Sequence, residues 1–273
     1  MNTISAVSCT QCGGAVSAAP GRSFPTCLFC GADARDLVAV DADIERPMGV
    51  GPFVRSEDET RDEFRRFSGS SLFYPSDLRE AKLELRRIFV PAWAFSATVE
   101  THFTGLVSAR TASGKEPVSG KVTDRFTHVL IPGSAALTQA ELRALGSFLT
   151  TLEPFDPDAT DIDFEVSTVT REAARDHARS EIAERHANAI ARQRALIEIR
   201  PSASVHDLKG EPVLIPVFVG VYRYRDMPYR FVVNGQTGRS YGEAPISPWR
   251  VAWLVAGLAL FVALLIVVAR AVS

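Results

Sequence analysis

Four cysteines are the residues of this chain best suited to hold a metal ion. They are Cys9, Cys12, Cys27 and Cys30, they follow the spacing C-x2-C-x14-C-x2-C, and the chain has no other cysteine. A glycine follows each pair, at Gly13 and Gly31. Glycine tolerates the positive φ angles of the tight turn that folds a cysteine pair over one ion. Four thiolates in a tetrahedron are ligands that Zn2+ prefers at a closed structural site, so the pattern predicts a zinc ribbon.

Two disulfides in a secreted domain are the alternative interpretation of these cysteines. Residues 1–19 contain neither the basic segment nor the apolar stretch of a signal peptide, and the trailing glycines fit metal-binding knuckles. We therefore expect one structural zinc ion. Four cysteine ligands leave no position for water or substrate, so we expect no catalysis by this metal. Thiolates persist in a reducing compartment, which places the ribbon in the cytosol.

Enzyme signatures are absent from the sequence. It contains no HExxH, GxSxG, GxGxxG or phosphate-binding P-loop motif. His177 and Glu181 are four residues apart and could share a metal, but without a third ligand we favour an exposed pair. His186 falls on the apolar face of the same expected helix, and we interpret it as a half-buried packing residue. We expect no enzyme, no catalytic residue and no cofactor other than zinc, although a site assembled only by folding stays open.

The C-terminal segment is the strongest membrane signal. No charged residue occurs from 251 to 269, and Arg250 and Arg270 flank this run. As a helix it would be about 28 Å long, close to the bilayer hydrocarbon core of about 30 Å. Trp249 and Trp253 stand at its entrance, where amphipathic rings favour the headgroup level. A buried core helix is the alternative, but the run has no polar face. We predict a single C-terminal transmembrane helix, a tail anchor whose partner is the lipid bilayer.

The cysteines also predict the orientation of the chain in the membrane. Arg250 and Arg270 nearly balance, so the distribution of positive charge does not decide it. A reduced ribbon requires the N-terminus and most of the chain to lie in the cytoplasm.

Composition limits the classes of partner. The chain has 273 residues, 46% of them hydrophobic, and its 30 Lys and Arg against 32 Asp and Glu give a net charge of −2. Within residues 1–40 the charges cancel, because Arg22 and Arg35 face Asp33 and Asp36. Nucleic-acid binding requires clustered cations that release counterions from phosphates. A ribbon this neutral favours docking to a protein.

The sequence predicts an α+β fold in five parts. We expect a zinc ribbon at 1–40, a flexible linker at 41–70, an α+β domain at 71–241, a short linker at 242–250, and the transmembrane helix at 251–269. Within the linker, the charged run 56–63 has little to bury and is interpreted as solvated.

Local patterns predict the elements of the central domain. We expect helices at 76–88, 138–151 and 171–199, strands at 89–107 and 126–131, a loop at 111–121, and a β-hairpin segment at 213–241. Thr138 and Glu141 form a capping box, with Leu137 and Leu142 as the hydrophobic staple. Asn234-Gly235 predicts a type I′ turn. Residues 214–219 echo 89–94, which suggests a duplicated β unit, although similar strand chemistry explains the echo equally well.

The motifs taken together resemble a family of bacterial membrane-anchored proteins with a TFIIB-type zinc ribbon, often labelled primosomal or helicase-like. The segments that carry the resemblance are 9–13, 27–31, 90–93, 131–134, 153–156, 231–238 and 242–245, in this order along most of the chain. The resemblance implies a single-pass protein of the bacterial cytoplasmic membrane. It also implies partners among SPFH-domain scaffold proteins and phage-shock-protein-A-type proteins in envelope stress.

These observations lead to one expectation about function. We expect a non-enzymatic adaptor that docks a protein partner at the cytoplasmic membrane surface. The alternative is a membrane-tethered nucleic-acid-binding protein, which the ribbon type suggests and the charge disfavours.

Overall fold

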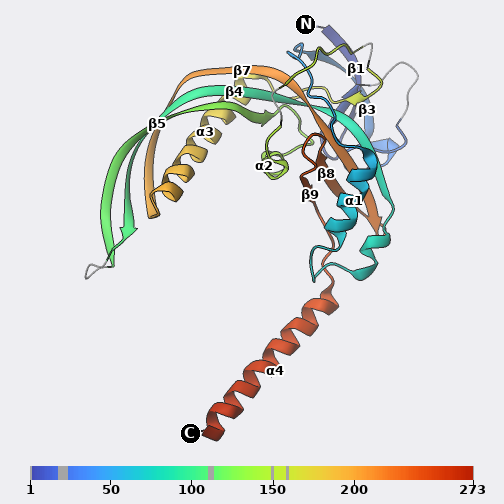
Figure 1. Ribbon diagram of the computed structural model, residues 1–273. Coiled ribbons are helices and arrows are strands. Elements are labelled where there is room, and N and C mark those ends of the chain that lie inside the picture. Colours follow the sequence, from blue (N-terminus) through green and yellow to red (C-terminus); the bar gives the residue numbers. More distant parts are fainter. Residues whose placement is uncertain (1, 18–23, 110–113, 149–150, 158–159, 273) are drawn as a thin grey trace.

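The computed structural model confirms an α+β fold and divides its strands between two mainly antiparallel sheets (Figure 1). It describes residues 2–17, 24–109, 114–148, 151–157 and 160–272, with residues 2–4, 41–44, 264–265, 267 and 269–272 described by their backbone alone.

The smaller sheet belongs to the cysteine-bearing N-terminal segment. Its order is β2-β1-β3, formed by β2 (Ala15–Ser17), β1 (Asn2–Cys9) and β3 (Leu37–Ile44). The 3-10 helix η1 (Ala34–Asp36) leads into β3. The sheet therefore continues beyond the boundary expected at residue 40, because β3 pairs with β1 along its whole length, from Leu37 opposite Cys9 to Ile44 opposite Asn2.

The larger sheet has the order β5-β4-β7-β8-β9, and β6 (Asp163–Phe164) adds parallel to β4. Its strands are β4 (Leu83–Ser108), β5 (Lys115–Pro132), β7 (Leu196–Tyr224), β8 (Met227–Asn234) and β9 (Ser240–Gly242). Figure 1 shows β5, β4 and β7 bending away from the ribbon as a long three-stranded arm, here called the distal arm. The loop expected at 111–121 is shorter than predicted, because β5 begins at Lys115; residues 110–113 lie outside the described part.

Strand β7 begins much earlier than the sequence indicates. Residues 196–199 were expected to end a helix, and no strand was expected between residues 200 and 212. Instead β7 pairs with β4 almost continuously, from Leu196 opposite Val107 to Tyr222 opposite Leu83. Strand propensity depends on the neighbouring strand, so long-range pairing here overrides weak local signals. The two echoing segments lie within this pairing, with Phe89 opposite Pro216 and Pro91 opposite Leu214.

Helix α3 (Arg171–Gln193) covers one face of the distal arm (Figure 1). Thr170 caps its start, because its hydroxyl accepts a hydrogen bond from the Ala173 N–H. Small side chains at Ala174 and Ala178 let the helix approach the strands closely, and Ile182 packs with them into the core formed by Trp93, Phe95, Ala97 and Val99. His186 is fully buried rather than half-buried.

Two expectations for residues 41–88 are wrong. In place of a flexible charged segment, Glu57–Ser68 forms helix α1, capped by Ser56 and Glu59 in a full capping box. Phe64 buries the apolar side of this helix against Tyr222 and Phe231. The long helix expected at 76–88 is only the 3-10 turn η2 (Ser76–Glu80), because Leu83 already starts β4.

Helix α2 (Gln139–Leu145) confirms the capping box. Thr138 accepts from the Glu141 N–H, and the Glu141 carboxylate accepts from the Thr138 N–H. The helix ends before the expected residue 151, because Gly146 has φ +77° and turns the chain. Residues 149–150 lie outside the described part.

The type I′ turn expected at Asn234-Gly235 is a longer loop. Gly238, with φ +77°, donates its N–H to the Asn234 carbonyl. The Asn234 side chain is buried, accepts from the backbone N–H of Gln236 and Thr237, and donates to the carbonyls of Leu145 and Ser147. Asn234 therefore joins this loop to the end of α2.

Helix α4 (Pro248–Val272) forms the C-terminus and points away from the rest of the molecule (Figure 1). Its described large apolar side chains are exposed, except that of Val251, which is partly buried. Among the residues that the structure describes, no helix is long and apolar enough to cross a membrane. Side chains 264–265, 267 and 269 of the predicted transmembrane run lie outside the description, and the transmembrane helix stays a prediction.

The buried pair Thr101 and His186 holds α3 to the sheet and gives a first prediction. The Thr101 hydroxyl lies 2.8 Å from His186 Nδ1, and Asp124 Oδ2 lies 3.2 Å from His186 Nε2. Thr101→Val would leave a buried ring nitrogen without a partner, so we expect it to lower the free energy of unfolding by about 1–3 kcal/mol. Thr104→Val, on the exposed side of the same strand, should change it by less than about 0.5 kcal/mol. Urea unfolding measures both, and equal effects would contradict this role.

Candidate metal centre

The structure brings all four predicted cysteines together. Their sulfur atoms lie within 4.8 Å of one another. Cys9 Sγ is 3.8 Å from Cys30 Sγ, and Cys12 Sγ is 3.7 Å from Cys27 Sγ. Zinc–sulfur bonds of about 2.3 Å in a tetrahedron place the sulfurs about 3.8 Å apart, whereas a disulfide requires about 2.0 Å. All four cysteines are free thiols in the structure, so the arrangement fits one tetrahedral ion rather than two disulfides.

Two similar backbone turns aim the sulfurs at the common centre. In the first, Gly13 N–H donates to the Cys9 carbonyl at 2.8 Å, and in the second Gly31 N–H donates to the Cys27 carbonyl at 3.0 Å. Gly13 and Gly31 have φ of +74° and +72°, which confirms the reason for glycine at these positions. The Phe29 N–H also lies 3.4 Å from Cys27 Sγ and supports its thiolate.

The two knuckles are built into the core of the larger sheet. Phe29 is fully buried among strand residues of both sheets and α2, including Val90, Ile215 and Leu142. A Cβ at Gly14 would lie 2.6 Å from the Phe29 ring, so glycine is required for this close contact. A metal bound here would therefore stabilise both the ribbon and its docking to the sheet.

Hydrogen bonding prepares one cysteine as a thiolate. A hydrogen bond from the Cys12 thiol lowers the pKa of Cys27 to about 5. The same bond raises the pKa of Cys12, so this pair retains one shared proton. Burial raises the pKa of Cys30 to about 11. Zinc binds thiolates, so loading the site must release the remaining protons.

A second feature, which the sequence analysis missed, lies where the ribbon meets the larger sheet. Glu165 N–H donates to the Phe89 carbonyl, and the next residue, Val166, donates to the Ala15 carbonyl of β2. The segment thus joins the two sheets. The Glu165 side chain is almost completely buried, and its Oε1 accepts from the Ser134 hydroxyl at 2.6 Å.

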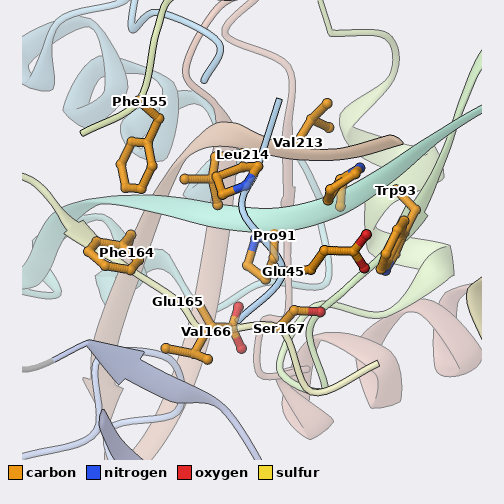
Figure 2. Close-up of a pocket in the computed structure, with 13 residues that line it drawn as sticks. Glu45, Pro91, Trp93, Phe155, Phe164, Glu165, Val166, Ser167, Val213 and Leu214 are labelled. Atoms are coloured by element: carbon orange, nitrogen blue, oxygen red, sulfur yellow. The ribbon is translucent and has the colours of Figure 1, made fainter. Parts of the chain in front are cut away.

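Figure 2 shows Glu165 at the edge of a small cavity whose walls include Pro91, Trp93 and Phe164. The cavity holds about 40 Å³, which is room for only a few atoms. Glu165 Oε2 has no hydrogen-bond partner among the described protein groups. Burial raises the pKa of Glu165 to about 8, against the opposing effects of Ser134 and Arg230. A cavity this small suits ordered water better than a substrate.

The other titratable groups named from the sequence do not form a metal site. Glu181 is buried and forms ion pairs with Arg143 and Arg185, so the expectation of an exposed His177–Glu181 pair is wrong for its glutamate. Among the described residues the cysteine cluster is the only group of three or more potential ligands found close together. Helical spacing alone did not reveal Arg143, because this partner comes from α2.

One group has the residue types of a catalytic triad. His186 of α3 lies between Asp124 of β5 and Thr101 of β4, at the distances given above. The Thr101 hydroxyl is fully buried, so no substrate can reach it in this structure. The Thr101 hydroxyl is within hydrogen-bonding distance of His186 Nδ1, whereas His186 Nε2 has no hydrogen-bond partner among the described groups. No family model, no curated protein and no solved structure matches this chain.

The cysteine geometry predicts one zinc ion per molecule. Full-length protein should contain one equivalent of zinc, and Cys27→Ser should lose most of it and lower the thermal midpoint. Thr26→Ser, beside the ligand, should retain the metal. Metal analysis and thiol titration measure the outcome: four reactive thiols should emerge when the protein is denatured with a chelator. Denatured, unreduced protein without reactive thiols would instead indicate two disulfides and contradict the site.

The raised pKa of Glu165 predicts that the stability of the folded protein depends on pH. The unfolded chain loses this proton near the ordinary value of 4.5 and the folded chain near 8, so folding retains a proton between these values. Stability should therefore fall as pH rises across this window, by up to about 1.4 kcal/mol per pH unit. The Glu165→Gln variant cannot ionise at this position, so its stability relative to the wild type should increase from pH 5 to pH 8. Glu198→Gln, exposed on β7, should not. Unfolding curves across this range test the sign, and parallel pH profiles for wild type and Glu165→Gln would contradict it.

Proposed function

We propose that this protein is a non-enzymatic adaptor, anchored to the bacterial cytoplasmic membrane, that binds a protein partner on its cytoplasmic side. Zinc holds the ribbon against the sheet in this proposal and takes no part in chemistry. A set of four sulfur ligands supports the structural role, because it leaves no open coordination position.

The observation that carries the proposal is an open face of the distal arm. Residues opposite one another in antiparallel strands point to the same side. Thr98, Glu100, His102 and Thr104 of β4 therefore share a face with their partners on β5 and β7. The alternate residues Val99, Thr101 and Phe103 are buried on the α3 side.

We call this open side the distal polar face. Besides the four β4 residues it comprises Ser119, Lys121, Thr123, Arg125, Arg200, Ser202, Ser204 and His206. All its residues on β5 and β7 are exposed. Their side chains are polar or charged, with Lys121, Arg125 and Arg200 against the single carboxylate of Glu100. A broad polar surface with excess positive charge suits an acidic protein surface.

The edges of the distal arm add to this surface. Among the described strands, β5 pairs only with β4, and the first half of β7 likewise pairs only with β4. Both edges therefore offer backbone groups to which a partner strand could add. The resemblance to zinc-ribbon membrane proteins supplies candidate partners, the SPFH-type and phage-shock-type scaffolds.

Helix α4 supports the membrane part of the proposal. Trp249, Trp253, Leu258 and Phe261 are more than half exposed although they are apolar. A helix with this many exposed apolar side chains requires a lipid or protein environment to cover them. The proposed anchor spans 251–269, with the N-terminus in the cytoplasm.

One observation favours the alternative of a membrane-tethered nucleic-acid-binding protein. The same three cations of the distal polar face could contact phosphates. Lys121 is already paired with Glu100 at 2.8 Å, which leaves a weak electrostatic footprint. We therefore keep the protein partner as the main proposal.

A pull-down of full-length protein from detergent extract separates the two functions. We expect a specific protein partner that survives nuclease treatment and is lost when Arg125→Glu and Arg200→Glu are combined, because the excess positive charge is reversed. The matched control combines Arg175→Glu and Arg179→Glu, on exposed positions of α3, and should retain the partner. Capture that disappears with nuclease and weakens steeply with salt would instead favour nucleic acid.

A further inference from the structure

The loop between α1 and η2 presents two apolar side chains to solvent beside the start of α4. Leu72 is 84% exposed and Phe73 is 39% exposed. Ile246, Trp249 and Trp253 are also strongly exposed, at 65%, 69% and 65%. We call these five residues the base patch. They come from two segments far apart in the sequence.

Hydrogen bonds tie the two segments together. The Ser247 N–H donates to the Phe73 carbonyl at 2.8 Å, and Arg250 Nη1 donates to the Leu72 carbonyl at 3.1 Å. The loop therefore lies against the first turn of α4. Its apolar side chains remain exposed despite these contacts, so the contacts position them without covering them.

The loop itself is held in shape by the folded domain. Ser71 accepts a hydrogen bond from the Phe73 N–H at 3.2 Å, and its carbonyl accepts from Tyr74. The Tyr74 ring packs on Phe67, 5.6 Å between centroids, and Phe67 packs on the core residue Phe231. The packed loop thus holds Leu72 in place, while the Leu72 side chain is not covered by any other part of the described chain.

The place where the Leu72–Phe73 loop meets α4 indicates what surrounds the loop. The charge-free run starts at Val251, and the loop is bonded to Ser247 and Arg250, within about one helical turn of 5.4 Å. If this run spans the bilayer, the Leu72–Phe73 loop lies at the level of the lipid headgroups. Trp249 and Trp253, in edge-to-face contact at 5.8 Å, mark the same level.

We propose that Leu72 and Phe73 form a second membrane contact, inserted into the interfacial layer of the bilayer beside the entrance of α4. This inference rests on the proposed membrane anchor and adds a residue-level contact to it. The occupant of the base patch is lipid because the patch is continuous with the anchor helix. Its paired tryptophans and the neighbouring Arg250 guanidinium match the apolar and anionic layers of an interface.

The contact changes how the domain is attached. Residues between β9 and α4 do not form a free tether, because Glu243 donates its N–H to Arg230 and accepts from the Tyr222 hydroxyl. With the loop inserted as well, two separate segments hold the domain at the bilayer. The base of the domain then stays against the membrane instead of swinging on one chain.

Fluorescence of a single introduced indole tests this contact. Full-length protein carrying Trp249→Phe and Trp253→Phe is combined with Leu72→Trp and reconstituted into phosphatidylcholine–phosphatidylglycerol vesicles. The remaining Trp93 is buried and gives a constant background. We expect the indole introduced at position 72 to emit at shorter wavelength and to be quenched by lipids brominated near the headgroup end of the acyl chain.

The matched control is Val38→Trp in the same background. Val38 is exposed on β3, in the ribbon, which Figure 1 places away from α4, and its indole should remain unquenched. Vesicle flotation reports the anchor separately. A chain that floats while position 72 behaves like position 38 overturns the second contact and leaves the anchor intact. A blue shift without bromine quenching would place protein on the patch and also overturn the inference. A chain that does not float overturns the anchor, and this contact with it.

Discussion

The pairing of β4 with β7 is the interaction on which the other parts of the structure depend. These strands run antiparallel from Leu83 opposite Tyr222 to Val107 opposite Leu196. At one end their side chains hold the ribbon, α1 and α2, and at the other end they hold α3. The paired residues are 89 to 139 positions apart in the sequence, so ordering the two strands requires closing a long loop. Local structure in α3 and the β4–β5 hairpin reduces the part of the chain that remains unordered.

A metal ion held by the four cysteines would couple its own binding to the docking of the ribbon on this sheet. Cys9 and Cys27 are buried in the same cluster as Val90 and Ile215, so losing a bound ion would loosen the packing between the two sheets. The interface between ribbon and sheet also buries Glu165, whose Oε2 has no hydrogen-bond partner among the described protein groups, and this burial costs stability. A buried carboxylic acid that is neutral near pH 7 can donate one hydrogen bond, for which a water in the adjacent cavity is the natural acceptor.

The sequence was most reliable where a feature depends on neighbouring residues. The knuckle glycines, the capping box of α2 and the start of α3 were predicted because each is fixed within a few positions of the chain. The cysteine cluster could also be predicted, since its spacing reflects the coordination chemistry of one ion. Features that depend on distant partners were missed: Arg200 to Pro212 becomes strand only through β4, and Glu181 is buried only because Arg143 reaches it from α2. Helix α1 was missed for another reason. Its charges suggested solvent, whereas Phe64 and Phe67 supply the apolar side.

The fold shows how the charged residues of the chain are distributed among its surfaces, which the net charge alone does not reveal. A net charge of −2 conceals the excess of cations on the distal polar face, because many carboxylates are used elsewhere in local pairs such as Arg65–Asp62 and Arg66–Glu63 on α1. Exposed pairs of this kind add little stability. The excess of cations lies on the distal polar face, where in the proposed function it would attract an acidic protein partner.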